Sequence, residues 1–283
     1  MPPDLWARWD LEPSIIVGIA LLSAGYAYAN GPFRRRHELG PPASRKQIAF
    51  FVAAQITLIV ALLSPLDELG DTYLFSAHML QHLLLATLWP PLMLLSIPEW
   101  LARRFWRGWV AAVGATITLP LFALAAFNLD IYLWHVPTLY DLTLTNGNVH
   151  ILEHLSFMAF GLLNWWPILS PILEQRLSAP LQVLYLFLDG MLMMALGIVF
   201  TFIPVVLYTP YLSAPRLWGI SAISDQQIGG LIMWYPGNVP YFIWLVLGFY
   251  KWIDSGEADP ELYFAESPTI EPAHEPIPGV DPR

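Results

Sequence analysis

Two pairs of histidines, each spaced four residues apart, are the residues of this sequence best suited to bind a metal ion. The first pair lies in the segment His78-Met79-Leu80-Gln81-His82, and the second pair is His150 and His154. Residues four apart lie on one face of an α-helix, so each pair presents two imidazoles side by side. Neutral imidazole binds copper, zinc and haem iron. A buried polar contact between helices would explain either pair alone, whereas two such pairs favour a metal site.

Two neighbours of these pairs are further candidates for the site. Met79 adjoins the first pair, but on a helix its side chain points about 100° away from either histidine. Glu153 adjoins the second pair and could accept a hydrogen bond that orients an imidazole. The sequence has no cysteine, which excludes disulfides, thiolate metal sites and cysteine nucleophiles. Any metal must therefore be held by His, Met, Asp, Glu or the backbone.

The composition predicts that helices in a membrane position these residues. The chain has 283 residues, of which 56% are hydrophobic and 12% are charged, whereas a soluble domain carries about 25% charged residues. We therefore predict an all-α integral membrane protein, a bundle of about seven transmembrane helices. The predicted spans are 14–29, 48–63, 73–97, 110–127, 149–169, 181–206 and 227–252.

Prolines and charges divide the chain further. Pro90-Pro91 should kink the third span, and Pro236 and Pro240 should kink the seventh. Residues 1–252 then form the transmembrane domain, and residues 253–283, rich in Pro and acidic residues, are predicted to be a disordered cytoplasmic tail. Part of the net charge of −9 comes from this tail, so we expect no nucleic-acid partner.

The distribution of Lys and Arg predicts the orientation in the membrane. Eleven of the 13 basic residues fall in alternate loops and after the last span, and only Arg8 and Arg216 fall on the other side. Because basic residues are retained in the cytoplasm, the N-terminus is predicted outside and the C-terminus in the cytoplasm.

This orientation places five of the seven histidines at the outer face. His78 and His82 fall in the outer half of span three, and His150 and His154 fall near the outer end of span five. His135 falls in the external connection between spans four and five. That connection, residues 128–148, is rich in aromatic residues and is predicted to lie at the interface and cover the histidines.

Several other polar or sulfur-containing residues lie within or beside the spans. Asp189 lies near the middle of span six, where a carboxylate is costly, and is either functional or a neutral acid bonded to a neighbouring helix. Asp225 opens span seven with Ser224, and helix capping explains both as well as a ligand role does. Thioethers favour Cu(I) but most often only pack in apolar helices. The methionines concerned are Met191, Met193, Met194 and Met233.

An ordered set of motifs resembles the polytopic CtaG-type cytochrome c oxidase assembly factors, a seven-span family linked to caa-type oxidases. The resemblance covers residues 14–252. It rests on His78-Met79-Leu80-Gln81-His82 with Pro90-Pro91, Tyr132-Leu133-Trp134-His135-Val136-Pro137, Leu139-Tyr140-Asp141, His150, Glu153-His154, Trp165-Trp166-Pro167, Asp225-Gln226-Gln227-Ile228-Gly229-Gly230 and Met233-Trp234. The single-span copper chaperone of the same name relies on cysteines and is not similar.

The resemblance implies a multi-pass protein of the bacterial plasma membrane that is needed to make active haem–copper oxidase. It implies that copper, as Cu(I), is bound outside the membrane and passed to oxidase subunits, with no catalysis by the chain itself. The functional positions carried over are His78, His82, His135, His150 and His154, followed by Asp225 and Met233. Membrane lipid is an expected partner, and a homodimer stays open.

Three alternatives stay open from the residues themselves. Three histidines around zinc with an open position would make a membrane hydrolase. Histidines from two facing helices would make a haem-b electron carrier. A scaffold that binds oxidase subunits and uses its histidines only for packing is the third.

Overall fold

The computed structural model describes residues 5–255, and within that range the chain is helical and contains no strand. The predicted all-α class is confirmed. The α-helices are α1 (Pro13–Tyr28), α2 (Arg34–Arg36), α3 (Arg45–Leu62), α4 (Pro65–Glu68), α5 (Phe75–Leu83), α6 (Trp89–Ser96), α7 (Glu99–Phe105), α8 (Gly108–Ile117), α9 (Pro120–Trp134), α10 (Pro137–Thr143), α11 (Gly147–Leu169), α12 (Ala179–Phe202), α13 (Thr209–Ser213), α14 (Ala222–Trp234) and α15 (Val239–Asp254).

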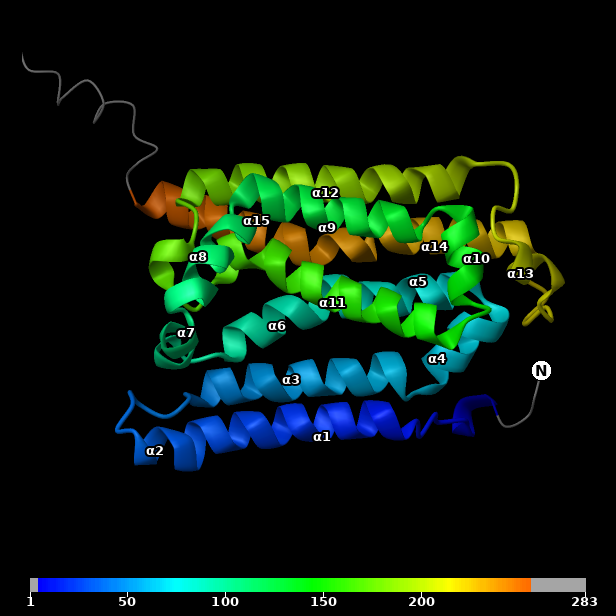
Figure 1. The fold of residues 1–283 in the computed structure, drawn as a ribbon. Helices are drawn as coiled ribbons and strands as arrows, with labels where there is room; N and C mark the ends of the chain where they lie inside the picture. The colour runs from blue at the N-terminus through cyan, green and yellow to red at the C-terminus, as the bar shows by residue number, and fades with distance from the viewer. Residues whose placement is uncertain (1–4, 256–283) are drawn as a thin grey trace, which may run out of the picture.

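Six short turns complete the helical structure. Three are 3-10 turns, η1 (Leu5–Ala7), η5 (Leu173–Gln175) and η6 (Pro236–Asn238), and three are π-helical turns, η2 (Ala29–Phe33), η3 (Leu69–Tyr73) and η4 (Leu84–Leu88). Figure 1 shows α5, α6 and α11 in the middle of the bundle, between α1 and α3 on one side and α12 on the other.

The length and apolar character of the helices identify a multi-pass membrane protein. Within residues 5–255, five helical segments are long and apolar enough to cross a membrane, namely 13–36, 45–62, 75–96, 179–202 and 222–254. The pair α8 and α9 would make a sixth. The predicted segment 149–169 coincides with α11, whose His150, Glu153 and His154 make it less apolar. The count of seven spans and the orientation of the termini stay predictions.

Two of the predicted kinks coincide with irregular turns. The π-turn η4 immediately precedes Trp89 and the Pro90-Pro91 pair, because proline at 90 and 91 cannot donate the backbone hydrogen bonds of a regular helix. Pro236 begins the 3-10 turn η6, which separates α14 from α15. Both interruptions therefore have proline as their cause.

The predicted span 110–127 is wrong as a single helix. The chain breaks at Thr118 and Leu119, where α8 and α9 meet at 71°. Pro120 begins α9, and the residue before a proline is driven out of the helical conformation. The helix α9 then continues to Trp134, so the first third of the predicted interfacial segment 128–148 is instead the end of a long helix.

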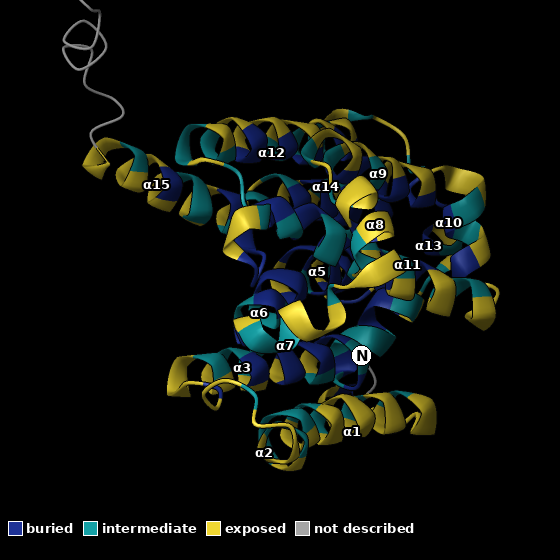
Figure 2. Cartoon of the chain, turned by 60° about the vertical axis from the view of Figure 1, so that its left-hand side comes forward, coloured by how far each residue is buried: buried dark blue, intermediate teal, exposed yellow. Residues whose placement is uncertain are grey.

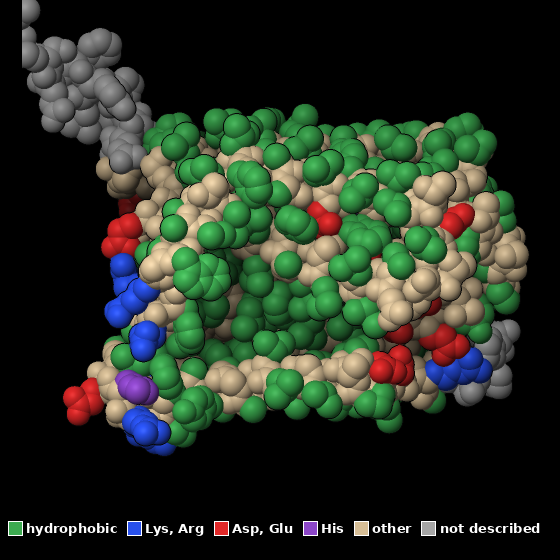
Figure 3. Space-filling model, viewed as in Figure 1, with side chains coloured by type: hydrophobic (Ala, Val, Ile, Leu, Met, Phe, Trp, Pro, Cys, Tyr) green, Lys and Arg blue, Asp and Glu red, His purple; other side chains and the backbone are tan. Residues whose placement is uncertain are grey.

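The end of the transmembrane domain also differs from the prediction. The helix α15 runs to Asp254, so residues 253 and 254 belong to that helix and not to the tail. The rest of the predicted tail, from residue 256, lies outside the described residues. The first helix packs loosely, and no residue of α1 is buried. A hollow of about 600 Å³ lies between α1 and the α6–α7 region, and Figure 3 shows a face hollowed over hydrophobic side chains.

The core is formed where α5, α12 and α14 pack together. Figure 2 shows buried residues concentrated on α5 and on the inner faces of the surrounding helices, with exposed residues on the outside. Gly229 and Gly230 face different neighbours. Gly229 lies against Phe75 and Met79 of α5, and Gly230 lies against the backbone of α12. These two glycines let α14 fit between α5 and α12.

Candidate metal centre

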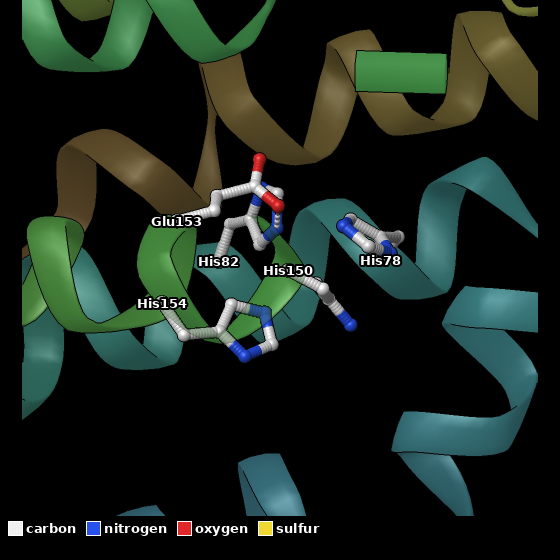
Figure 4. Close-up of side chains that lie close together, drawn as sticks. All are labelled: His78, His82, His150, Glu153 and His154. Carbon is white, nitrogen blue, oxygen red and sulfur yellow. Dashed lines mark ion pairs between the residues drawn. The ribbon is translucent and has the colours of Figure 1, made fainter. Parts of the chain in front are cut away.

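Two helices bring four histidines and one glutamate together in the interior. His78 and His82 lie on α5, and His150, Glu153 and His154 lie on α11. One ligand atom from each of the five side chains lies within 4.8 Å of every other. Figure 4 shows the side chains of the two helices directed toward one another. The structure thus places α5 beside α11, which the sequence analysis only assumed. We call these five residues the histidine cluster.

The cluster is buried, and most of its ring nitrogens make no hydrogen bond within the described chain. His78 is 0% exposed, His82 4% and His154 8%. Neither ring nitrogen of His78 or His82 has a hydrogen-bond partner within the described chain. Nε2 of His150 and Nε2 of His154 also lack a hydrogen-bond partner within the described chain. Buried polar atoms are almost always hydrogen-bonded, so this donor set fits a bound cation better than it fits simple packing.

Glu153 lies inside the cluster. Its Oε2 is 3.8 Å from His82 Nε2, and its side chain is 0% exposed. Neither of its carboxylate oxygens has a hydrogen-bond partner within the described chain. A carboxylate in this place can act either as a ligand itself or as the group that orients His82. The prediction that Glu153 orients a histidine stays open between these two roles.

Asp71 is a site residue that the sequence analysis missed. It lies in the turn η3 before α5, and its two oxygens face histidines on different helices. Oδ1 is 3.3 Å from His78 Nδ1, and Oδ2 is 3.4 Å from His150 Nδ1. Burial opposes ionisation of this carboxyl, but its contact with His78 and the charge of His150 outweigh burial and lower the Asp71 pKa. An ionised Asp71 can therefore orient both rings.

The turn that carries Asp71 is held against α5 by its neighbour. A Cβ on Gly70 would lie 3.0 Å from the His78 Cα, so a larger residue at position 70 would push the turn and α5 apart. The Tyr211 hydroxyl donates a hydrogen bond of 2.7 Å to the Gly70 carbonyl. The sequence offered a weak signal, an acidic residue next to glycine shortly before a histidine pair.

His135 and Met79 make a second contact beside the cluster. His135 lies in the turn directly after α9, within the predicted connection, and is buried. Its Nδ1 donates to the Ile131 carbonyl at 2.7 Å, which leaves Nε2 unprotonated, 3.4 Å from the Met79 sulfur. The Met79 side chain was predicted to point away from His78 and His82, and in the structure it contacts His135. The rings of His135 and His82 lie with centroids 6.1 Å apart.

Asp225 supports the cluster from a distance. Its Oδ2 accepts a hydrogen bond of 2.7 Å from the Phe75 backbone N–H. Its Oδ1 accepts bonds from both the backbone N–H and the hydroxyl of Ser76. Asp225 therefore caps the first turn of α5, and Ser221 caps its own helix α14 by accepting from Ser224 N–H. The expected capping of α14 by Asp225 or Ser224 is wrong, because α14 already begins at Ala222. Asp225 instead accepts hydrogen bonds from the first turn of α5.

The remaining candidates lie in other surroundings. The oxygens of Asp189 accept hydrogen bonds from the amides of Asn128 and Asn164, so its contacts join α12 to α9 and α11. Met193 and Met233 are buried in the hydrophobic core that also contains Met79. The other two methionines border a groove on the outside of α12, and they are Met191 and Met194.

The sequence comparisons identify the family. A sequence model of the cytochrome c oxidase caa3 assembly factors matches residues 24–255, which is most of the chain. The chain belongs to this family. The match spans α5, α9, α11 and α14, and thus all the residues of the histidine cluster together with Asp71, His135 and Asp225. The resemblance seen in the motifs is confirmed.

Two curated proteins similar to this chain have no stated function. Uncharacterized proteins of Mycobacterium bovis and Mycobacterium tuberculosis are each 25% identical to it in an alignment of 262 residues that covers 86% of the chain. The chain spans only 39% of the length of these relatives. No solved structure matches it.

The Asp67 carboxyl, which contacts Gln81 of α5, should make the stability of the protein depend on pH. Burial and the charge of Asp71 raise the pKa of Asp67 to about 7, although a hydrogen bond of 2.6 Å from Gln81 acts in the opposite direction. In the unfolded chain this carboxyl titrates near pH ~3.9. Because the folded state keeps a proton that the unfolded state has lost, the free energy of unfolding should fall as pH rises from about 4 to about 7.

Thermal unfolding in detergent across this pH range, with Asp67→Asn beside the parent, measures the effect. The free energy of unfolding of Asp67→Asn should fall less than that of the parent over this range. Both values should stop changing above pH ~7. The same slope in both proteins would contradict the prediction.

Proposed function

We propose that this assembly factor binds copper as Cu(I) in the histidine cluster and delivers it to a subunit of haem–copper cytochrome c oxidase. The observation that carries the proposal is the convergence of five imidazole and carboxylate groups, each with a ligand atom within 4.8 Å of the others. Family membership supports a role in oxidase assembly, and the imidazole ligands support copper as the metal.

The arrangement suits a cargo that must later be released. Imidazole binds copper, while the absence of cysteine removes the thiolates that would hold Cu(I) most tightly. The contact between His135 and Met79 adds a nitrogen and a thioether sulfur next to the cluster. A copper ion leaving the cluster would meet this pair, whose ligand types also favour Cu(I).

Zinc is the second candidate metal, because two carboxylates adjoin the histidines. Glu153 faces His82, and Asp71 faces His78 and His150. Zinc accepts mixed His and carboxylate ligands, and a carboxylate beside a zinc-bound water can act as a base. This arrangement would give a hydrolase instead of a metallochaperone.

Metal analysis of the purified protein tests the proposal. The parent, loaded with Cu(I) under reductant, should retain copper in stoichiometric amount. The variant His78→Ala/His154→Ala, which removes one ligand from each helix, should lose it. His37→Ala, an exposed histidine of the loop after α1, is the matched control and should bind copper like the parent.

A cellular assay connects binding with assembly. In cells that lack the chromosomal copy, the parent and His37→Ala should restore oxidase activity, and His78→Ala/His154→Ala should not. Zinc in the parent, with no copper taken up, would instead support the hydrolase. Metal in neither protein would contradict both.

A further inference from the structure

We propose that an acidic pocket beside the histidine cluster is the route by which a copper cation reaches the cluster from solution. This inference rests on the proposed function, because it names the path to the same site. The ligand is a small cation, and the pocket holds it only in passing.

The pocket is formed where the N-terminal turn meets the connection between α3 and α5. Its volume is about 360 Å³. Most of its lining comes from the three residues that follow η1 on one side, and from α4 and η3 on the other. The lining residues are Arg8, Trp9, Asp10, Ser64, Asp67, Glu68, Asp71 and Thr72. Figure 3 shows acidic and basic side chains together at this end of the molecule.

Charge makes the pocket attractive to cations. Four of its eight lining side chains are carboxylic acids, and one is an arginine. That arginine, Arg8, forms an ion pair with Glu68. The acids outnumber the single arginine, and such an excess of negative charge raises the local concentration of cations and their association rate. A polar cavity at the other end of the bundle differs, because its lining includes Arg103 and Arg107.

The pocket is more than a group of surface acids, because one of its acids contacts a buried histidine whose Nε2 has no hydrogen-bond partner among the described residues. Asp71 lines the pocket and also touches the cluster, with Oδ1 3.3 Å from His78 Nδ1. His78 is 0% exposed, and neither of its ring nitrogens has a hydrogen-bond partner within the described chain. The Asp71 carboxylate thus links the pocket directly to a buried nitrogen of the histidine cluster.

The contact between Gly70 and His78 keeps this junction in place. The turn η3 lies so close to α5 that a Cβ at position 70 would be 3.0 Å from His78 Cα. The Asp71 carboxylate therefore stays between His78 and His150, which lie on different helices. A cation attracted into the pocket can exchange its contact with Asp71 for contacts with these two imidazoles.

The experiment measures the rate of copper uptake. Cu(I) is supplied to the full-length protein in detergent as a coloured chelator complex, and the loss of colour is followed by stopped flow at low and high salt. The test variant is Asp10→Asn/Glu68→Gln, which removes two acids that do not touch the histidines. The matched control is Glu99→Gln/Glu174→Gln, which removes two acids that pair with Arg103 at the other end.

We expect the test variant to take up Cu(I) more slowly at low salt, on the order of tenfold, with the same final amount bound. High salt should slow the parent and the control but change the test variant little. Equal rates in all three proteins would overturn the inference and leave the proposed function standing. No uptake by the parent would overturn both.

A folding defect in Asp10→Asn/Glu68→Gln can be distinguished from a slower uptake of Cu(I). Thermal unfolding identifies such a defect. In that case Asp10→Asn alone carries the test, because the Asp10 side chain is exposed. Asp10→Asn should slow Cu(I) uptake less than the double variant does, and it should also make the rate insensitive to salt. An uptake rate and a salt dependence like those of the parent would overturn the inference.

Discussion

Asp225→Ala should destabilise the folded protein by about 2 to 4 kcal/mol, because it leaves buried hydrogen-bond donors without an acceptor. Asp225 accepts from the Phe75 N–H, the Ser76 N–H and the Ser76 hydroxyl, and the bond to Phe75 is buried, so the Phe75 N–H would be left without an acceptor. The variant should also bind copper more weakly, since α5 begins at Phe75 and carries His78 and His82. Unfolding in mixed micelles and Cu(I) titration measure the two effects.

Ser224→Ala is the matched control for this prediction. Ser224 is the preceding residue, is exposed, and its hydroxyl contacts only the Ser221 hydroxyl. Its loss should change stability by less than about 1 kcal/mol. Asp225→Asn, which keeps one acceptor oxygen, should fall between the two. If Asp225→Ala unfolds at the same point as Ser224→Ala, the cap does not stabilise α5.

Gly230→Ala should separate α14 from α12 and cost about 3 kcal/mol. The added Cβ would lie 2.6 Å from the Thr201 backbone nitrogen and 2.7 Å from the Gly197 carbonyl oxygen. Backbone atoms on a packed helix cannot move aside as a flexible side chain can. The strain should therefore exceed the gain of about 1 kcal/mol that alanine brings to a helix interior. The free energy of unfolding in detergent measures the difference.

Gly25→Ala gives the comparison. Gly25 lies within α1, and nothing comes within 4 Å of a Cβ built there. The same substitution should therefore leave stability unchanged or raise it slightly. A similar loss for both variants would show that helix flexibility, and not the close approach of α12 and α14, determines the effect of Gly230.

Much of the helical framework follows from hydrophobicity and proline alone. Apolar runs are long in this chain, and each predicted span overlaps a helix. The break before Pro120 was missed because both sides of it are apolar, so hydropathy does not change where the backbone turns. Thr118 and Leu119 mark a bend that only the restriction before proline could have predicted.

The site was predictable where it depended on helix periodicity. Spacing places His78 beside His82 and His150 beside His154, and the structure adds that the two pairs face each other. Periodicity also gave the direction of Met79 relative to its neighbours, but the identity of its partner, His135, depends on how α9 packs against α5. Spacing within one helix carries no information about contacts between helices.

The residues that the sequence could not reveal are those whose role depends on distant contacts. Asp71 lies in a turn where an acid usually remains solvated, and only packing brings it between two histidines. Asp225 looked like the cap of its own helix because local capping is the common use of such a residue. Its partner is 150 residues away along the chain, which no local pattern indicates.

The same separation has a consequence for how the protein is made. The ribosome releases α5 and α11, with His78, His82, His150 and His154, well before it synthesises Asp225. A nascent chain that stops short of α14 therefore contains the whole histidine cluster but leaves the first turn of α5 uncapped. We therefore expect the histidine cluster to become rigid only after α14 has been synthesised and Asp225 has capped the first turn of α5.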